Sequence, residues 1–176
     1  LLQREYELWR SDLVRLHDEN ERMTAQGFAE ALAHTLEKRE RMLKLLSMNH
    51  YDLEARARTE KLVEFKVAYG GSIRAVALCL EKFFPAMSAQ DIQGFIYAFF
   101  PFLFGAWPYT FVTPRQQQAM EAAGVPYVPL SLYEITCSCA RRLLEGLWRA
   151  GHLGAQMRRP AQGRGTAQRT RRPRKA

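Results

Sequence analysis

The sequence lacks the short motifs that identify the common classes of enzyme and metalloprotein. Its four histidines form neither an HxxxH nor an HExxH pair, and its three cysteines form no CxxC pair. It also contains no GxSxG, Walker or GxGxxG sequence, and no repeated Glu-x-x-His pair of the kind that binds a di-iron centre. We therefore predict no catalytic residues, no metal site and no cofactor, and a protein that is not an enzyme.

The cysteines are too few and too unevenly spaced to form a disulfide framework. Cys137 and Cys139 lie two residues apart, so they point in different directions on a helix, and Cys79 is distant from both in sequence. We expect all three to be small buried residues of a protein that works in a reducing compartment.

Acidic residues are missing from the end of the chain. Residues 158–176 hold eight of the 26 Lys and Arg residues and no Asp or Glu, so the other 18 basic residues balance the 18 acidic ones. The net charge of +8 therefore belongs to this end, and its composition predicts a disordered basic tail over residues 155–176. Two roles stay open for the tail: it keeps the protein soluble, or it attracts nucleic-acid phosphates without sequence specificity.

Strand alternation is absent, whereas apolar residues recur at helical spacing along most of the sequence. One apolar stripe predicts a long helix over residues 2–22, and we expect a break near residue 38 or 39 in the region that follows. Further stripes predict helices over 53–84, 88–107 and 131–150. Thr24, Ser88, Thr113 and Ser131 have the sequence context of helix N-caps. These features predict an all-α bundle that forms one domain over residues 1–154.

Charge is also absent from Gly94 to Val112, a run of 19 residues that is almost long enough to span a membrane. Pro101, Gly105 and Pro108 interrupt the run, and a helix in a bilayer core tolerates such residues poorly. We therefore favour a helix without membrane contact, buried partly in the core and partly against a second copy of the chain. Two other function classes remain: a helical enzyme or lipid-handling protein with an apolar pocket, and a membrane-associated helical protein.

Four phrases resemble the C-terminal regulatory core of TetR-family transcriptional regulators: "REYELWRSDL", "RMLKLLSMNHYDLEARARTEKLVEFK", "FFPFLFGAWPYTFVTPRQQQAMEAAGV" and "SLYEI". With the order of the helices, the resemblance covers about residues 1–150. It implies an all-α, cytoplasmic, homodimeric core that binds a small-molecule effector, with residues 1–23 as the linking helix. In this family an N-terminal domain binds operator DNA, and we expect that domain to be absent from this chain.

The resemblance also implies where the effector and the second copy bind. Residues 53–84 resemble the helix that lines the ligand cavity, and residues 88–107 and 131–150 resemble the dimer pair. The residues expected to contact a small, apolar effector are Asn49, His50, Tyr51, Phe65, Tyr69, Tyr97, Phe100, Phe104 and Trp107. The residues expected at the dimer interface are Phe95, Phe99, Phe102, Leu132, Ile135, Cys139, Leu143 and Leu147. A capped helix end at residues 49–51, and plain core packing of the aromatic residues, are the alternatives.

Overall fold

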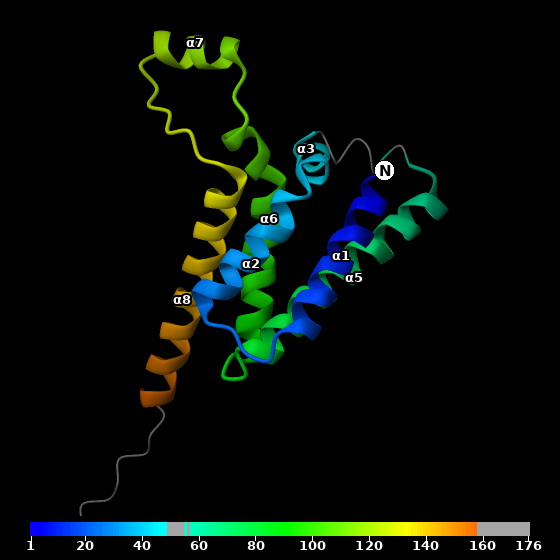
Figure 1. Ribbon diagram of the computed structural model, residues 1–176, viewed down its shortest axis with the longest axis vertical. Helices are drawn as coiled ribbons and strands as arrows, with labels where there is room; N and C mark the ends of the chain where they lie inside the picture. The colour runs from blue at the N-terminus through cyan, green and yellow to red at the C-terminus, as the bar shows by residue number, and fades with distance from the viewer. Residues whose placement is uncertain (49–54, 56, 158–176) are drawn as a thin grey trace, which may run out of the picture.

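The structure is a computed structural model that describes residues 1–48, 55 and 57–157, and the side chains up to residue 147. Within these residues the chain is a helical bundle without strands, as predicted (Figure 1). Its helices are α1 (Leu2–Glu19), α2 (Ala25–Glu37), α3 (Glu40–Ser47), α5 (Thr59–Phe83), α6 (Ala89–Thr110), α7 (Pro114–Ala122) and α8 (Leu132–Met157).

The predicted helix starts are confirmed, because each cap residue accepts a hydrogen bond from the first turn. The donors to Thr24, Ser88, Thr113 and Ser131 are the backbone N–H groups three residues later in each case. Hydrogen bonds from Ser88 to the Asp91 carboxylate lower the pKa of that group. This bonding therefore stabilises α6 at neutral pH, and the contribution is lost as the pH falls through the lowered pKa.

Three predicted helix ends differ from the structure, and the first is that of α1, which ends at Glu19 instead of residue 22. The break at residues 38–39 is confirmed, since α2 ends at Glu37 and α3 begins at Glu40. The predicted helix over 88–107 continues to Thr110, and the predicted helix over 131–150 continues to Met157. Helix α5 begins at Thr59, and the proposed start near residue 53 lies outside the described residues.

Pro101 is tolerated within α6 because it lies on the exposed side, where a carbonyl without its helical partner faces solvent.

Helices α1 and α5 lie side by side and run in the same direction (Figure 1). Three side chains of α5 donate hydrogen bonds to backbone carbonyls of α1. Ser72 Oγ donates to the Tyr6 carbonyl at 3.0 Å, and Cys79 Sγ to the Leu13 carbonyl at 3.6 Å. Lys82 Nζ donates to the His17 carbonyl at 2.7 Å. Because the partners advance together along both helices, these bonds fix the position of α1 along α5.

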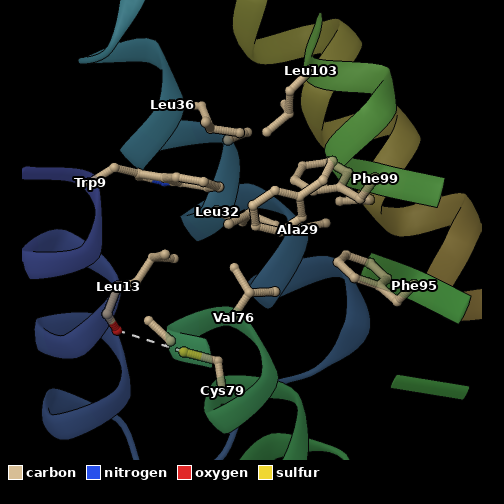
Figure 2. Packing of buried hydrophobic residues seen from close by; sticks show 14 of the residues in the cluster. Trp9, Leu13, Ala29, Leu32, Leu36, Val76, Cys79, Phe95, Phe99 and Leu103 are labelled. Carbon is tan, nitrogen blue, oxygen red and sulfur yellow. Dashed lines mark hydrogen bonds between the residues drawn. The ribbon is translucent and has the colours of Figure 1, made fainter. Parts of the chain in front are cut away.

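The core lies between this parallel pair and the antiparallel pair of α6 and α8, with α2 passing through the middle (Figures 1 and 2). Helices α1, α2, α3, α5, α6 and α8 all contribute buried side chains to it, among them Trp9, Leu13, Ala29, Leu32, Leu36, Val76, Cys79, Phe95, Phe99 and Leu103. Much of the side of α5 that meets α1 consists of small residues, namely Ala68, Ser72, Ala75 and Cys79. Large α1 side chains can therefore pack closely against the α5 backbone.

The two adjacent glycines of α5 differ in their surroundings. A Cβ added at Gly70 would meet nothing within 4 Å, whereas one at Gly71 would lie 3.1 Å from Arg10 Cδ. We expect Gly70→Ala to raise the free energy of unfolding by about 1 kcal/mol, because alanine favours a helix over glycine by that amount. Gly71→Ala should gain less, because Arg10 has to move. Urea denaturation of both variants tests this, and an equal or larger gain at Gly71 would contradict it.

Candidate functional site

Five aromatic side chains from three helices meet near the N-terminal ends of α1 and α5. They form the aromatic cluster, which consists of Tyr6 and Trp9 of α1, Phe65 and Tyr69 of α5, and Phe100 of α6. The ring centroids of Tyr6 and Tyr69 lie 5.3 Å apart and those of Tyr69 and Phe100 lie 5.8 Å apart, both edge to face. Trp9 lies 5.6 Å from Phe100, and Tyr6 lies 5.8 Å from Phe65. These are favourable distances and orientations for aromatic pairs.

The structure brings together three of the residues predicted to contact an effector, namely Phe65, Tyr69 and Phe100. Phe100 is buried, whereas Phe65 and Tyr69 are half-buried at the edge of the cluster. Phe104 follows one turn after Phe100 on α6 and is also half-buried. The cluster therefore combines a closed interior with an edge that offers apolar contact area.

Other predicted effector contacts lie elsewhere. Tyr97 is 72% exposed on the outer side of α6, so it does not reach the aromatic cluster. Trp107 stacks on Phe111 at a centroid distance of 5.3 Å near the end of α6, rather than on the cluster. Asn49, His50 and Tyr51 lie outside the described residues. Sequence reasoning also missed Tyr6 and Trp9, which it placed in an apolar stripe without assigning them to the site.

Helix α1 is joined to α2 and α3 by polar contacts beside the cluster. Trp9 Nε1 donates to Thr35 Oγ1 of α2 at 3.0 Å, and this hydroxyl donates in turn to the Leu32 carbonyl at 2.7 Å. Asp12 of α1 pairs with Arg39 at the break between α2 and α3, and both side chains are largely buried. Helix α1, which carries two residues of the aromatic cluster, is therefore in contact with α2, α3 and α5.

Two of the cysteine thiols are made less reactive by burial. Burial raises the pKa of the Cys79 thiol to about 11, and burial likewise raises the pKa of Cys139 to about 11. Both thiols are therefore protonated at neutral pH and react poorly. Among the described residues, no group of three or more His, Cys, Asp or Glu side chains is placed to hold a metal ion.

The outer side of α6 carries a stripe of exposed small residues and prolines at helical spacing. This α6 stripe consists of Gly94, Ala98, Pro101, Gly105 and Pro108. Half-buried apolar residues of α6 and α8 lie beside it, namely Phe102, Ile135, Cys139, Leu143 and Leu147. At one point the contact is direct, because a Cβ at Gly94 would lie 3.6 Å from Leu147 Cδ2.

Three predicted interface residues point into the chain's own core instead. Phe95 and Phe99 are fully buried, stacked on each other at a centroid distance of 5.3 Å, and Leu132 is 8% exposed. Helix α6 is apolar on nearly all sides, so sequence periodicity did not indicate which side faces inward. The buried side is the one that packs against α8, α3 and α5 within the protomer.

Two shallow hollows flank Tyr97 on this outer surface. One has a volume of about 690 Å³ and is lined by Ile73 of α5 and by Ala89, Gln90, Ile92, Gln93, Ile96 and Tyr97 of α6. The other, of about 520 Å³, is lined by Gln90, Asp91, Gln93, Gly94 and Tyr97 of α6 and by Leu147 of α8. The exposed Tyr97 ring therefore projects from this surface between two hollows.

Helix α7 and its connections project from the ends of α6 and α8 (Figure 1). We call residues 109–131 the arm. None of the single helices described is long and apolar enough to cross a membrane. Helices α6 and α7 meet that requirement only as a pair, by length and composition, and they are bent by 85° at their junction.

Comparison with known proteins gives one family. A family model described as "Tetracyclin repressor-like, C-terminal domain" matches residues 3–150, which is most of the chain and all of its helical body up to the last turns of α8. No curated protein matches the chain. No solved structure matches it either.

Proposed function

Since the chain belongs to the tetracycline-repressor-like family of C-terminal regulatory domains, we propose that it binds a small apolar effector at the aromatic cluster and forms a homodimer. The single observation that carries this proposal is that the cluster is shared by α1, α5 and α6. A molecule that binds at the edge of the aromatic cluster contacts Phe65, Tyr69 and Phe104. Phe65 and Tyr69 in turn contact Tyr6 of α1. The site is mostly apolar, as small-molecule sites in proteins usually are.

Helix α1 corresponds in this proposal to the helix that links the core to DNA-binding heads. Effector binding favours one arrangement of α1 over another, because the effector interacts differently with the two arrangements. Two heads on one DNA face must lie about 34 Å apart to occupy successive half-sites. A change in the angle of α1 in each copy alters that separation, so the effector controls binding to operator DNA.

The α6 stripe supports the homodimer. No charged residue occurs between Asp91 and Arg115, although α6 exposes one side along its whole length. An exposed surface without charge is typical of the centre of a protein interface, and small residues let two helices approach closely. The half-buried apolar residues of α8 beside the stripe extend the same surface.

Native mass spectrometry of protein purified without detergent tests both halves of the proposal. We expect the mass of a dimer, with a retained small molecule if the effector is present in the expression host. Tyr69→Ala should weaken binding of the retained molecule by about tenfold, because one aromatic contact is lost. Val67→Ala, on the exposed side of the same helix, is the matched control and should leave binding unchanged. Equal binding by both variants would contradict the site.

A further inference from the structure

The arm is a well-formed structure that buries little within its own protomer. Helix α7 has nine residues and no buried side chain, although isolated helices of fewer than about 12 residues are only marginally stable in water. Both of its ends are nevertheless fixed. Thr113 and Gln116 form a capping box at the start. At the end Gly124 has a φ of 65°, and the Val125 N–H donates to the Met120 carbonyl at 2.9 Å.

The surface of the arm is apolar and nearly uncharged. Its large exposed apolar residues are Tyr109, Phe111, Val125, Val128 and Leu130. Arg115 and Glu121 are its only charged residues, and they are of opposite sign. Prolines at positions 114, 126 and 129 restrict the chain and lower the entropy lost when the arm is held in place. This surface has no net charge to attract phosphates, and it suits an apolar protein surface.

An apolar surface of matching character lies at the opposite end of α6. The larger hollow beside Tyr97 is lined by Ile73, Ile92 and Ile96 together with uncharged glutamines. The hollow lies at the start of α6, whereas the arm leaves from its end. The two surfaces are therefore too far apart to meet within one protomer, because 16 residues of helix span about 24 Å.

A two-fold axis near Pro101 would bring these surfaces together. If α6 runs antiparallel to α6 of a second copy and crosses it at Pro101, positions equally far from residue 101 lie opposite each other. Tyr97 then lies over Gly105 of the second copy, where a Cβ would meet nothing within 4 Å. Tyr109, at the root of the arm, lies opposite Gln93 on the rim of the hollow. A parallel pairing would bring the two arms together and leave both hollows uncovered.

We propose that the arm of each copy packs across the homodimer onto the hollow beside Tyr97 of the other copy. The proposal rests on the proposed homodimer, and it specifies its geometry: α6 pairs antiparallel, and the arms lie on opposite ends of the interface. Each arm then gains the tertiary contact that α7 lacks in the protomer. The continuity of the arm with both α6 and α8, whose outer sides form the interface, favours a second copy over any other partner.

Cysteine cross-linking tests this geometry directly. The full chain carries Tyr109→Cys and Gln93→Cys together in a Cys139→Ser background, which removes the half-buried cysteine of the same surface. Mild oxidation followed by non-reducing electrophoresis should give a covalent dimer. An intrachain disulfide cannot form, because the two Cα atoms are separated by about 24 Å of helix and a disulfide spans less than about 7 Å. The two single-cysteine variants are the matched controls and should stay monomeric on the gel.

Each other outcome counts against a definite part of the proposal. A cross-link in Tyr109→Cys alone would mean that the two arms meet, and would overturn the antiparallel pairing. No cross-link in a protein that sedimentation shows to be a dimer would overturn the arm contact and leave the proposed function intact. A monomer in sedimentation would remove the homodimer as well.

A charge placed on the arm tests the contact independently of cross-linking, through the dissociation constant of the dimer. Phe111→Glu should raise the dissociation constant of the dimer about tenfold, whereas Val67→Glu, on the exposed side of α5 and outside the arm, should change it less than threefold. Phe111 is exposed in the protomer, so neither variant should alter the helical circular dichroism signal. Equal dissociation constants for the two variants would contradict the contact.

Discussion

Replacing Trp9 with alanine is expected to lower the free energy of unfolding by about 3–5 kcal/mol. The Trp9 side chain is fully buried and contacts both Tyr6 and Phe100. Alanine would remove most of this contact and leave a cavity where α1, α2, α5 and α6 meet. Since single domains are stable by only about 5–15 kcal/mol, the variant would lose a large share of its stability. Urea denaturation followed by circular dichroism measures the loss.

Trp9→Phe separates the two contributions of the indole ring. Phenylalanine keeps much of the apolar contact but cannot donate to Thr35, so we expect a loss of about 1–2 kcal/mol. The Thr35 hydroxyl still donates to the Leu32 carbonyl, and this limits the cost of the missing partner. An equal loss of unfolding free energy in Trp9→Ala and Trp9→Phe would mean that packing of the Trp9 ring does not stabilise the core. It would also contradict the proposed link between the aromatic cluster and α1.

Placing an arginine at Ala98 is expected to raise the dissociation constant of the dimer by at least about 100-fold. Ala98 is exposed near the middle of the α6 stripe, so dimer formation would bury one unpaired guanidinium from each copy. The protomer itself should fold normally, because the side chain points away from its core. Sedimentation velocity over a range of protein concentrations measures the dissociation constant, and the circular dichroism spectrum reports on the fold.

Val14→Arg is the matched control for this charge. Val14 is exposed on α1, away from the α6 stripe and from the hollow beside Tyr97, and the same substitution there should leave the dissociation constant nearly unchanged. A dimer that persists in Ala98→Arg with unchanged affinity would place the interface on another surface. A dimer that both substitutions weaken equally would indicate a general effect of charge instead.

Local structure was the part of the molecule that could be predicted best. Thr24, Ser88, Thr113 and Ser131 each satisfy backbone donors within three residues, so their effect depends only on neighbouring sequence. Helix ends were less predictable where no such signal exists: α6 continues past Pro108 to Thr110 because a proline on the exposed side does not end a helix that packing supports.

The candidate site could be predicted only in part, because aromatic residues serve in cores and in binding sites alike. Phe65 and Tyr69 lie four residues apart on α5, so their contact follows from their spacing, but nothing in the sequence indicates that Phe100 of α6 meets them. Tyr97, with the same chemistry as Tyr69, lies on the outside. Nothing in the spacing of these residues distinguishes them, since the difference arises from which helices pack against each side of α6.

The sequence by itself therefore determined the all-α class, the caps and the uncharged character of residues 92–114. The resemblance of the sequence to TetR-family regulatory cores also identified the family to which the chain belongs. Only the tertiary structure decided that Phe95 and Phe99 face inward while the α6 stripe faces outward. It also decided that α1 and α5 run parallel, joined by the hydrogen bond from Ser72 to Tyr6. The reason is physical: hydrogen bonds at helix ends are satisfied locally, whereas the direction in which an apolar helix is buried depends on distant partners.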